Sequence, residues 1–304
     1  GSYLATLPNI VQLIGWAAFE VMIIAQAANS VTQSLFGLSN YLVWVLFFTV
    51  WCTLMAISGP LAVVRQWLEK FAVWVVYGIT IYLTYYLFAT YDVGALLRQA
   101  GTGELPFWLG VDLVVAMPIS WMPLVADYSR FAKDADKAFW GTFLGYFVAN
   151  VWFYGLGALF VLALGTEELI PAIMAVTGGW AALILLLVDE TDDAFADIYS
   201  AAVSGQNILS EFKQWWLAVA VGVICFILAA TLPIGQYENF LLLIGSVFVP
   251  LFGILAADYF VLRRRHLDVD ELYRSGGAYW YQGGVNWMAV VAWAGGVAVV
   301  PRDC

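Results

Sequence analysis

Long apolar runs dominate this sequence, and they constrain its fold more than any other feature. An α-helix needs about 20 mostly apolar residues to cross the hydrocarbon core of a bilayer. Hydrophobic residues make up 63% of the chain and charged residues 11%, which lies outside the range of soluble globular proteins. The sequence therefore predicts an all-α integral membrane protein in contact with the lipid bilayer. Nine candidate spans can be placed, at about residues 4–29, 41–63, 71–91, 107–129, 138–164, 178–201, 214–232, 239–262 and 285–300.

Basic residues indicate the direction of the spans, because cytoplasmic loops are enriched in Lys and Arg. Every second loop is basic, and the loops between are uncharged or mostly acidic. The pattern predicts nine crossings that start inside the cell and end outside, with residues 266–284 as a polar cytoplasmic loop and no soluble domain. The basic residues behind this topology are Arg65, Lys70, Arg130, Lys133, Lys137, Lys213 and Arg263 to Arg265.

The composition argues against several other classes of protein. Twelve scattered Lys and Arg residues give no nucleic-acid-binding surface. Cys52, Cys225 and Cys304 form no disulfide framework. The sequence has no zinc-protease motif and no Ser/His pair within the spans, and its one histidine, His266, adjoins an Arg run. We therefore expect neither an enzyme nor an organic cofactor.

A polar stripe interrupts the first apolar run. Glu20 follows Gln12 and Trp16 at steps of four, so the three side chains share one helical face. Ionisable groups inside a bilayer are costly and need a partner or a function. Trp16 could stack on a flat ring, and Glu20 could accept its N–H hydrogen bonds. The alternative is a protonated or paired glutamate that only stabilises helix packing.

The sixth span leads from an apolar run directly into Asp189-Glu190-Thr191-Asp192-Asp193, followed by Asp197. A helix that ended at Val188 would cover only about 16 Å of a hydrocarbon core of about 30 Å. We therefore expect the helix to continue through the acidic stretch, with Asp189, Asp193 and Asp197 on one face. Carboxylates beside a hydroxyl suit Na⁺ or a proton relay. The alternative is a solvated acidic loop.

Two prolines, Pro118 and Pro123, lie within the fourth span. Proline lacks the backbone N–H and clashes with the preceding turn, so this pair should open the helix. Transporters use such interruptions to offer backbone groups to substrates and ions. A plain proline kink is the simpler alternative.

Several motifs, in this order, resemble those of the nucleobase:cation symporter-1 family. The family includes cytosine, purine, allantoin, hydantoin and hydroxymethylpyrimidine permeases, and the resemblance covers nearly the whole chain. The motifs are Gln12-Leu13-Ile14-Gly15-Trp16, the run from Ser120 to Phe131, Asp197-Ile198-Tyr199-Ser200, Pro250 to Ile254 and Asp258-Tyr259-Phe260.

The resemblance implies a LeuT-like bundle of two inverted five-helix repeats followed by two further helices, twelve in all. The nine spans would correspond to helices three to eleven, so the first two helices are expected to be missing from this chain. Residues 1–304 would form one transporter domain. Residues 1–91 would be the remainder of the first repeat, 107–262 the second repeat and 285–304 the start of the C-terminal helices.

The resemblance also assigns roles to residues. It implies that Trp16 stacks on the substrate and that Glu20 hydrogen-bonds it, with Gln12 nearby. Ser120 and Trp121 on the interrupted helix, and Asp189 and Asp197 on the sixth span, are the further substrate contacts. Thr191, Asp192 and Asp193 occupy the stretch where family members hold Na⁺, mainly with hydroxyl groups. Carboxylates in place of hydroxyls put Na⁺ coupling in doubt and favour a proton.

These observations together predict a secondary active transporter that imports a small heterocycle, coupled to Na⁺ or H⁺, by alternating access. Hydroxymethylpyrimidine, for thiamine salvage, and cytosine are the expected substrates, because both present an aminopyrimidine edge to Glu20. An amino-acid carrier of the same fold is the main alternative, although Glu20 would repel a substrate carboxylate. The expected location is a prokaryotic cytoplasmic membrane.

Overall fold

The structure is a computed structural model that describes residues 2–58, 71, 73–101, 103, 105–129, 132–165, 169–176, 178–272 and 274–299. Arg65, Lys70, Arg130, the acidic pair Glu167-Glu168 and Cys304 lie outside the described residues. Throughout the described part the regular elements are helices, as the apolar runs predict. The chain divides into two compact units, and each is described by itself.

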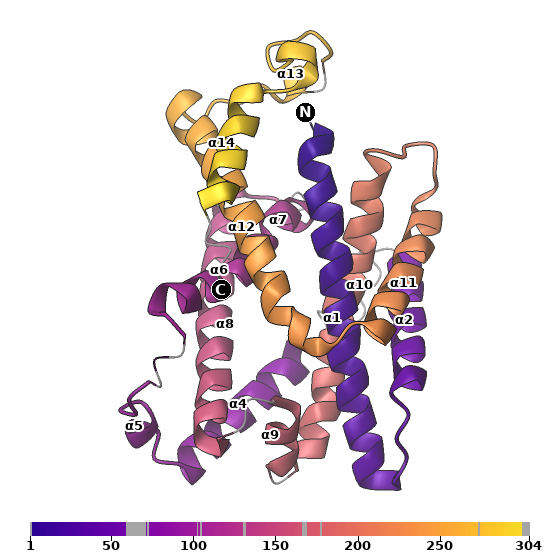
Figure 1. The fold of residues 1–304 in the computed structure, drawn as a ribbon, viewed down its shortest axis with the longest axis vertical. Coiled ribbons are helices and arrows are strands. Elements are labelled where there is room, and N and C mark those ends of the chain that lie inside the picture. Colours follow the sequence, from indigo (N-terminus) through magenta and orange to yellow (C-terminus); the bar gives the residue numbers. More distant parts are fainter. Residues whose placement is uncertain are drawn as a thin grey trace. The chain divides into compact units, whose positions relative to one another are not determined.

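The larger unit consists of Asn9–Glu104 and Asp127–Ile234. Its helices are labelled in Figure 1, and the N-terminal turns of α1 are assigned to the other unit. They are α1 (Ser2–Phe36), α2 (Tyr41–Ser58), α4 (Val73–Thr90), α5 (Val93–Leu96), α8 (Ala135–Leu164), α9 (Leu169–Ala175), α10 (Gly179–Gln206) and α11 (Gln214–Thr231).

The smaller unit consists of Gly1–Pro8, Leu105–Ala126 and Gly235–Cys304. Within it α12 packs against both α6 and α14, and the Trp293 indole of α14 donates to the Val247 carbonyl of α12 at 2.9 Å. The helical segments in and around this unit are α6 (Phe107–Ser120), α7 (Met122–Ser129), η2 (Ile234–Gln236), α12 (Tyr237–Ala256), the π-helix η3 (Ala257–Leu262), α13 (Val269–Leu272), η4 (Gln282–Gly284) and α14 (Trp287–Val299).

Local sequence signals explain where the long helices begin and end. Asp134 caps α8 by accepting a hydrogen bond from the Lys137 amide at 2.9 Å, and Gly165 ends this helix in the left-handed conformation at φ 62°. Gly178, which precedes α10, is also in the left-handed conformation, at φ 75°. Glycine adopts positive φ without the clash that a Cβ would cause.

The core of the larger unit is an apolar cluster shared by six helices. α1 contributes Ala27 and Val31, and the cluster also includes side chains of α4, α5, α8, α9 and α10. Polar contacts add to this packing: the Trp152 indole donates to Thr84 Oγ1 at 3.0 Å, and the Tyr41 hydroxyl donates to the Ala229 carbonyl at 2.8 Å. The second contact joins α2 to α11.

Seven helical segments among the described residues are long and apolar enough to cross a membrane. α10 is also long, about 42 Å at 1.5 Å per residue, but it carries the acidic stretch, and the described part of α14 has 13 residues. The seven candidates are Leu4–Phe36, Tyr41–Ser58, Val73–Thr90, Phe107–Ala126, Ala135–Leu164, Gln214–Thr231 and Ile234–Leu262.

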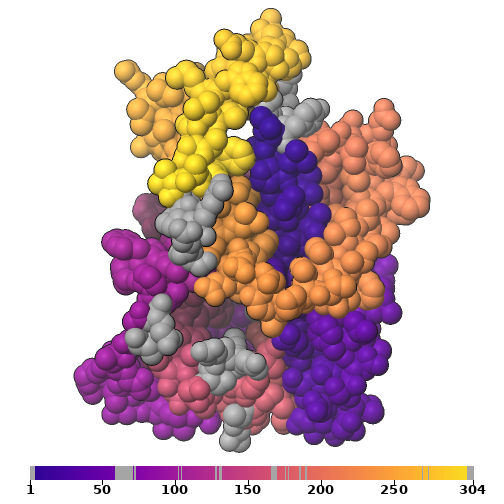
Figure 2. Space-filling view, in the orientation of Figure 1, coloured from indigo at the N-terminus to yellow at the C-terminus, as the bar shows by residue number. Residues whose placement is uncertain are grey.

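Large apolar side chains line the outside of these helices, as expected of surfaces that face lipid. On α2 they include Phe47, Trp51 and Leu54. In Figure 2 this part of the chain, coloured violet, lies on the visible surface of the molecule. On α8 the rings of Phe139, Phe143 and Phe147 stack along one side at centroid separations of 6.2 Å. Such surfaces are stable only in an apolar environment.

The structure adds detail to three of the expected spans. α1 does not end near residue 29 but continues to Phe36, and the Thr32 hydroxyl donates to the Ala28 carbonyl at 3.0 Å within it. The fourth span changes from α6 to α7 at Trp121, whose backbone stays in the right-handed helical region at φ −82° and ψ −12°. This agrees with a proline kink, and an opened helix stays a prediction. The eighth span ends in the π-helix η3.

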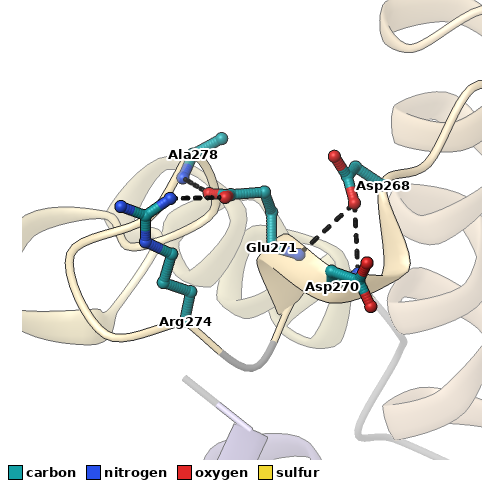
Figure 3. A network of polar contacts seen from close by, with 5 residues as sticks. All are labelled: Asp268, Asp270, Glu271, Arg274 and Ala278. Atoms are coloured by element: carbon teal, nitrogen blue, oxygen red, sulfur yellow. Dashed lines mark hydrogen bonds and ion pairs between the residues drawn. The ribbon is translucent and has the colours of Figure 1, made fainter.

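The expected polar loop at 266–284 is folded rather than irregular, and Figure 3 shows its network. Asp268 accepts hydrogen bonds from the amides of Asp270 and Glu271 at 3.1 and 3.4 Å, which starts the short helix α13. Glu271 in turn forms an ion pair with Arg274 at 2.9 Å and accepts from the Ala278 amide at 2.8 Å. Local carboxylates therefore order this loop.

The Arg run at the end of η3 anchors the same segment. Arg263 forms an ion pair with Asp258 at 2.6 Å, and its guanidinium lies 4.2 Å from the centre of the Tyr279 ring. The hydrogen bond to Asp258 raises the pKa of Arg263 above its already high ordinary value. Arg264 and Arg265 follow at φ 52° and 65°, so the chain turns sharply here.

Candidate functional site

The polar stripe predicted on the first apolar run is a buried face of α1. Gln12, Trp16 and Glu20 all lie inside the larger unit, and Glu20 is only 8% exposed. Small side chains such as Ala17 and Ala18 surround them on the helix. These small residues allow neighbouring helices to approach α1 closely.

α10 passes through the acidic stretch without a break, from Gly179 to Gln206. This confirms the continuous helix and contradicts the solvated-loop alternative. Thr191, Asp197 and Ser200 are buried, and Asp197 is 1% exposed, whereas Asp193 on the same helix is exposed. The length argument was correct because a helix that ended at Val188 would be too short to span a bilayer.

Glu20 of α1 and Asp197 of α10 face each other as a buried pair of carboxyl groups. Their side chains are within hydrogen-bonding range, and Asp193 and Glu190 add negative charge near Glu20. Glu20 Oε2 and both carboxyl oxygens of Asp197 have no donor among the described residues. The contact is therefore a hydrogen bond only when one of the two carboxyl groups carries a proton.

A chain of amide and hydroxyl groups continues this polar face toward the start of α1. The Gln12 amide donates to Asn9 Oδ1 at 3.0 Å, and the Asn9 amide donates to Ser204 Oγ of α10 at 3.0 Å. Ser200 lies buried on α10 between Asp197 and Ser204. Polar side chains of α1 and α10 thus face each other over several helical turns.

α2 and α11 complete the surroundings of this interface. The Cys225 thiol of α11 contacts the Ile14 carbonyl at 3.7 Å, and the Cys52 thiol of α2 contacts the Thr191 carbonyl at 3.6 Å. Tyr146 of α8 is electrostatically coupled to Asp193 and Asp197. No described lysine or arginine forms an ion pair with Glu20 or Asp197.

The expected cation-binding residues have different environments. The Thr191 hydroxyl donates to the Leu187 carbonyl of its own helix, Asp192 is half-buried and Asp193 is exposed. The side chain of Asp189 lies outside the described part. In the described part, no group of three His, Cys, Asp or Glu side chains is arranged to hold a metal ion. A Na⁺ site at Thr191, Asp192 and Asp193 stays a prediction.

Ser120 and Trp121 belong to the smaller unit, so the structure does not describe them together with Trp16 and Glu20. Ser120 is buried, and its hydroxyl donates to the Met117 carbonyl at 2.6 Å. Trp121 lies between α6 and α7, and the amides of Leu124 and Val125 donate to its carbonyl. Their contact with substrate stays a prediction.

Sequence reasoning missed Asn9 and Ser204, and it named Ser200 only as part of a family motif. Asn9 lies three residues before Gln12, on the same face of α1, and Ser204 lies seven residues after Asp197 on α10. The same helical spacing that indicated Gln12, Trp16 and Glu20 could have found them. Uncharged polar residues are common in membrane helices, so they gave a weaker signal than the carboxylates.

A separate cavity of about 420 Å³ lies between α4 and the start of α10. Its lining is largely apolar and includes Trp74, Gly78, Tyr82 and Ala181. Ala181 is 16 residues from Asp197, about 24 Å along the helix. The cavity is therefore distinct from the buried carboxyl pair.

Comparison with known proteins agrees with this arrangement of helices. Residues 1–300 match a family model described as permease for cytosine/purines, uracil, thiamine, allantoin. The chain belongs to the nucleobase:cation symporter-1 family. The family is described as one of permeases and not of enzymes, and the seven candidate spans of the described part agree with a multi-pass membrane protein.

Curated members of the family include bacterial permeases. A hydantoin permease of Microbacterium maritypicum is 26% identical over 318 residues, which cover 97% of this chain and 64% of the relative. The cytosine permease of Escherichia coli K12 is 27% identical over 209 residues, which cover 67% of this chain and 46% of the relative. The chain thus spans about half to two thirds of the length of these relatives.

Solved structures of the family member Mhp1 share the fold. The closed conformation with bromovinylhydantoin bound matches 98% of this chain and 70% of Mhp1 at a TM-score of 0.79 and 23% identity. The inward-facing conformation matches at a TM-score of 0.74. This confirms the expected all-α, LeuT-like transporter fold, whereas the repeat boundaries at 1–91, 107–262 and 285–304 stay predictions.

Proposed function

We propose that the protein is a secondary active transporter that imports a nucleobase-like heterocycle together with a cation. The buried stripe of Gln12, Trp16 and Glu20 on α1, opposite Asp197 on α10, is the observation that supports it most. An aromatic plane beside hydrogen-bonding carboxyl groups suits a flat ring that carries N–H groups. The family's relatives, which include hydantoin and cytosine permeases, act on rings of this kind by name.

The carboxyl groups favour a ring with an aminopyrimidine edge, where a ring nitrogen lies beside an exocyclic amine. Hydroxymethylpyrimidine, which would serve thiamine salvage, and cytosine both present that edge. An amino-acid or other small-solute carrier is the alternative function. The charge of Glu20, Asp193 and Asp197 works against it, because an amino acid brings a carboxylate of its own into the site.

Coupling to a cation would supply the energy for accumulation. One charge that crosses a membrane potential of 100 mV gains about 2.3 kcal/mol, which corresponds to roughly fifty-fold accumulation. We infer coupling to Na⁺ or H⁺, with Na⁺ expected at Thr191, Asp192 and Asp193. The acidic character of α10 and the buried carboxyl pair agree with a cation and not with an anion.

Binding to the purified full-length protein tests the proposal. A thermal-shift panel of hydroxymethylpyrimidine, cytosine, uracil, hydantoin and an amino acid, with and without Na⁺, should show stabilisation by one of the heterocycles. Stabilisation by the amino acid alone would support the alternative function. Absence of a response to every heterocycle, together with absence of uptake in liposomes, would contradict the proposed function.

The aromatic contact can be tested with Trp16→Ala. We expect a loss of heterocycle affinity of about five- to 150-fold, because base–aromatic stacking contributes about 1–3 kcal/mol per base. Trp140→Ala is the matched control, since Trp140 is 55% exposed on α8 and faces away from the core. Equal affinity in the two variants would remove Trp16 from the binding site.

A further inference from the structure

We propose that Glu20 and Asp197 together hold one exchangeable proton, and that this proton is the cation transported with the heterocycle. The inference rests on the proposed function and deepens it by naming the coupling ion and its carrier. Both side chains are more than nine-tenths buried, they come from different helices, and they face each other.

The geometry leaves the pair with too few donors. Glu20 Oε2 and both Asp197 oxygens have no donor among the described residues, although buried polar atoms normally have a hydrogen-bond partner. Two facing carboxylates repel each other strongly in a buried site. One shared proton removes one of the two charges and supplies the missing donor, with a charge-assisted O–H···O⁻ hydrogen bond as the result.

Among the described residues, the groups around the pair provide no positive charge. α10 presents Asp193 and Glu190, α8 presents Tyr146, α11 presents Cys225 and α2 presents Cys52. Each of these is acidic or neutral, and both described ion pairs of the chain, Arg263–Asp258 and Arg274–Glu271, belong to the C-terminal segment. No described cationic side chain therefore neutralises the pair, and we assign that role to a proton.

The singly protonated pair matches an amidine-like edge. The protonated carboxyl group donates to the ring nitrogen, and the carboxylate accepts from the exocyclic amine. The doubly deprotonated pair lacks the donor and repels the lone pair of the ring nitrogen. Base and proton thus each favour the same state of the site, and by linkage each increases the affinity for the other.

A route to the cytoplasmic side is present in the same interface. Ser200, the Asn9–Ser204 hydrogen bond and the Gln12–Asn9 hydrogen bond continue the polar face from the pair toward the start of α1. The positive-inside pattern predicts that α1 begins, and α10 ends, on the cytoplasmic side. Release leaves two carboxylates and transfers H⁺ to water, so charge and atoms balance.

Transport by the full-length protein in liposomes tests the proposal, with cytosine as the probe and a pH dye inside. In the absence of Na⁺ we expect cytosine uptake to acidify the interior, and the accumulation ratio to change about tenfold per unit of pH gradient. Glu20→Gln and Asp197→Asn should both lose pH-driven accumulation. Glu211→Gln, an exposed loop residue, is the control and should keep the coupling.

Wild-type measurements keep the test independent of variant folding. Calorimetry in buffers of different ionisation enthalpy should show proton uptake on cytosine binding, with affinity falling up to tenfold per pH unit above the range in which the pair holds its proton. Uptake driven by Na⁺ alone, without acidification, would overturn the proton inference and leave the proposed function standing. Absence of binding and uptake for cytosine, uracil and hydantoin under every gradient would instead overturn the proposed function.

Discussion

At the scale of single residues, burial distinguishes the polar groups of the candidate site from those that face outward. Glu20 and Asp197 are buried, whereas Asp193, one turn from Asp197 on α10, is exposed. Sequence spacing placed Gln12, Trp16 and Glu20 on one helical face, because positions on a single helix follow from its period alone. The spacing also singled out Asp197, but only the family resemblance placed it at the same site as Glu20, since contacts between helices depend on tertiary packing.

Asn9 gives a prediction about stability at this scale. Asn9→Leu removes the hydrogen bond to Ser204 and the acceptor for Gln12. We expect the free energy of unfolding in detergent to fall by about 0.6–1.7 kcal/mol, the range measured for hydrogen bonds between membrane helices. Asn150→Leu on α8 is the control, because the Asn150 side chain is bonded only to the Tyr146 carbonyl of its own helix. Unchanged stability of Asn9→Leu would show that the bond contributes nothing.

At the scale of elements, the apolar runs located most helices well where a clear stop signal follows. The seventh span was expected at 214–232, and α11 covers Gln214–Thr231. α1 was wrongly ended near residue 29, because Asn29, Ser30 and Thr32 are polar although the helix tolerates them. Hydropathy marks where lipid contact ends, whereas a helix ends only where its backbone hydrogen bonds end.

The close approach of α2 and α11 allows a prediction at this scale. A Cβ at Gly222 of α11 would collide with the Thr53 side chain of α2. Gly222→Val should therefore destabilise the protein by about 1–3 kcal/mol, the usual cost of overpacking. A Cβ at Gly145 of α8 would meet no atom within 4 Å, so Gly145→Ala is the control. Thermal unfolding followed by fluorescence would decide, and equal midpoints would show that the two helices separate without cost.

At the scale of the whole molecule, the sequence predicted the fold class because a bilayer admits few solutions for a chain with so many apolar runs. The family match over residues 1–300 and the likeness to Mhp1 confirm that class. Apolar periodicity could not predict that α1 packs beside α10, because lipid-facing and core-facing residues are both hydrophobic in this protein. Exposed Trp51 on α2 and buried Phe160 on α8 illustrate this.

Membrane topology remains a prediction for the entire chain, and cysteine labelling can test it. In a background with Cys304→Ser, we expect Leu38→Cys to react with an impermeant maleimide from outside, because Leu38 follows the first span and is 67% exposed. Ser275→Cys, in the loop ordered by Asp268 and Glu271, should react only after the membrane is opened. Labelling of both from the same side would contradict the alternation of basic loops.

The uninterrupted α10 also has a consequence for how the protein is made. The six Leu, Ile and Val residues at 183–188 favour entry into the membrane by about 2–4 kcal/mol in total. Two acidic residues near the centre of the helix already cost about 5–7 kcal/mol. α10 therefore cannot leave the translocon for lipid by itself. We therefore expect α10 to stay beside α1 and α2 until their side chains pack around its carboxyl groups, so that several helices of this protein enter the lipid together.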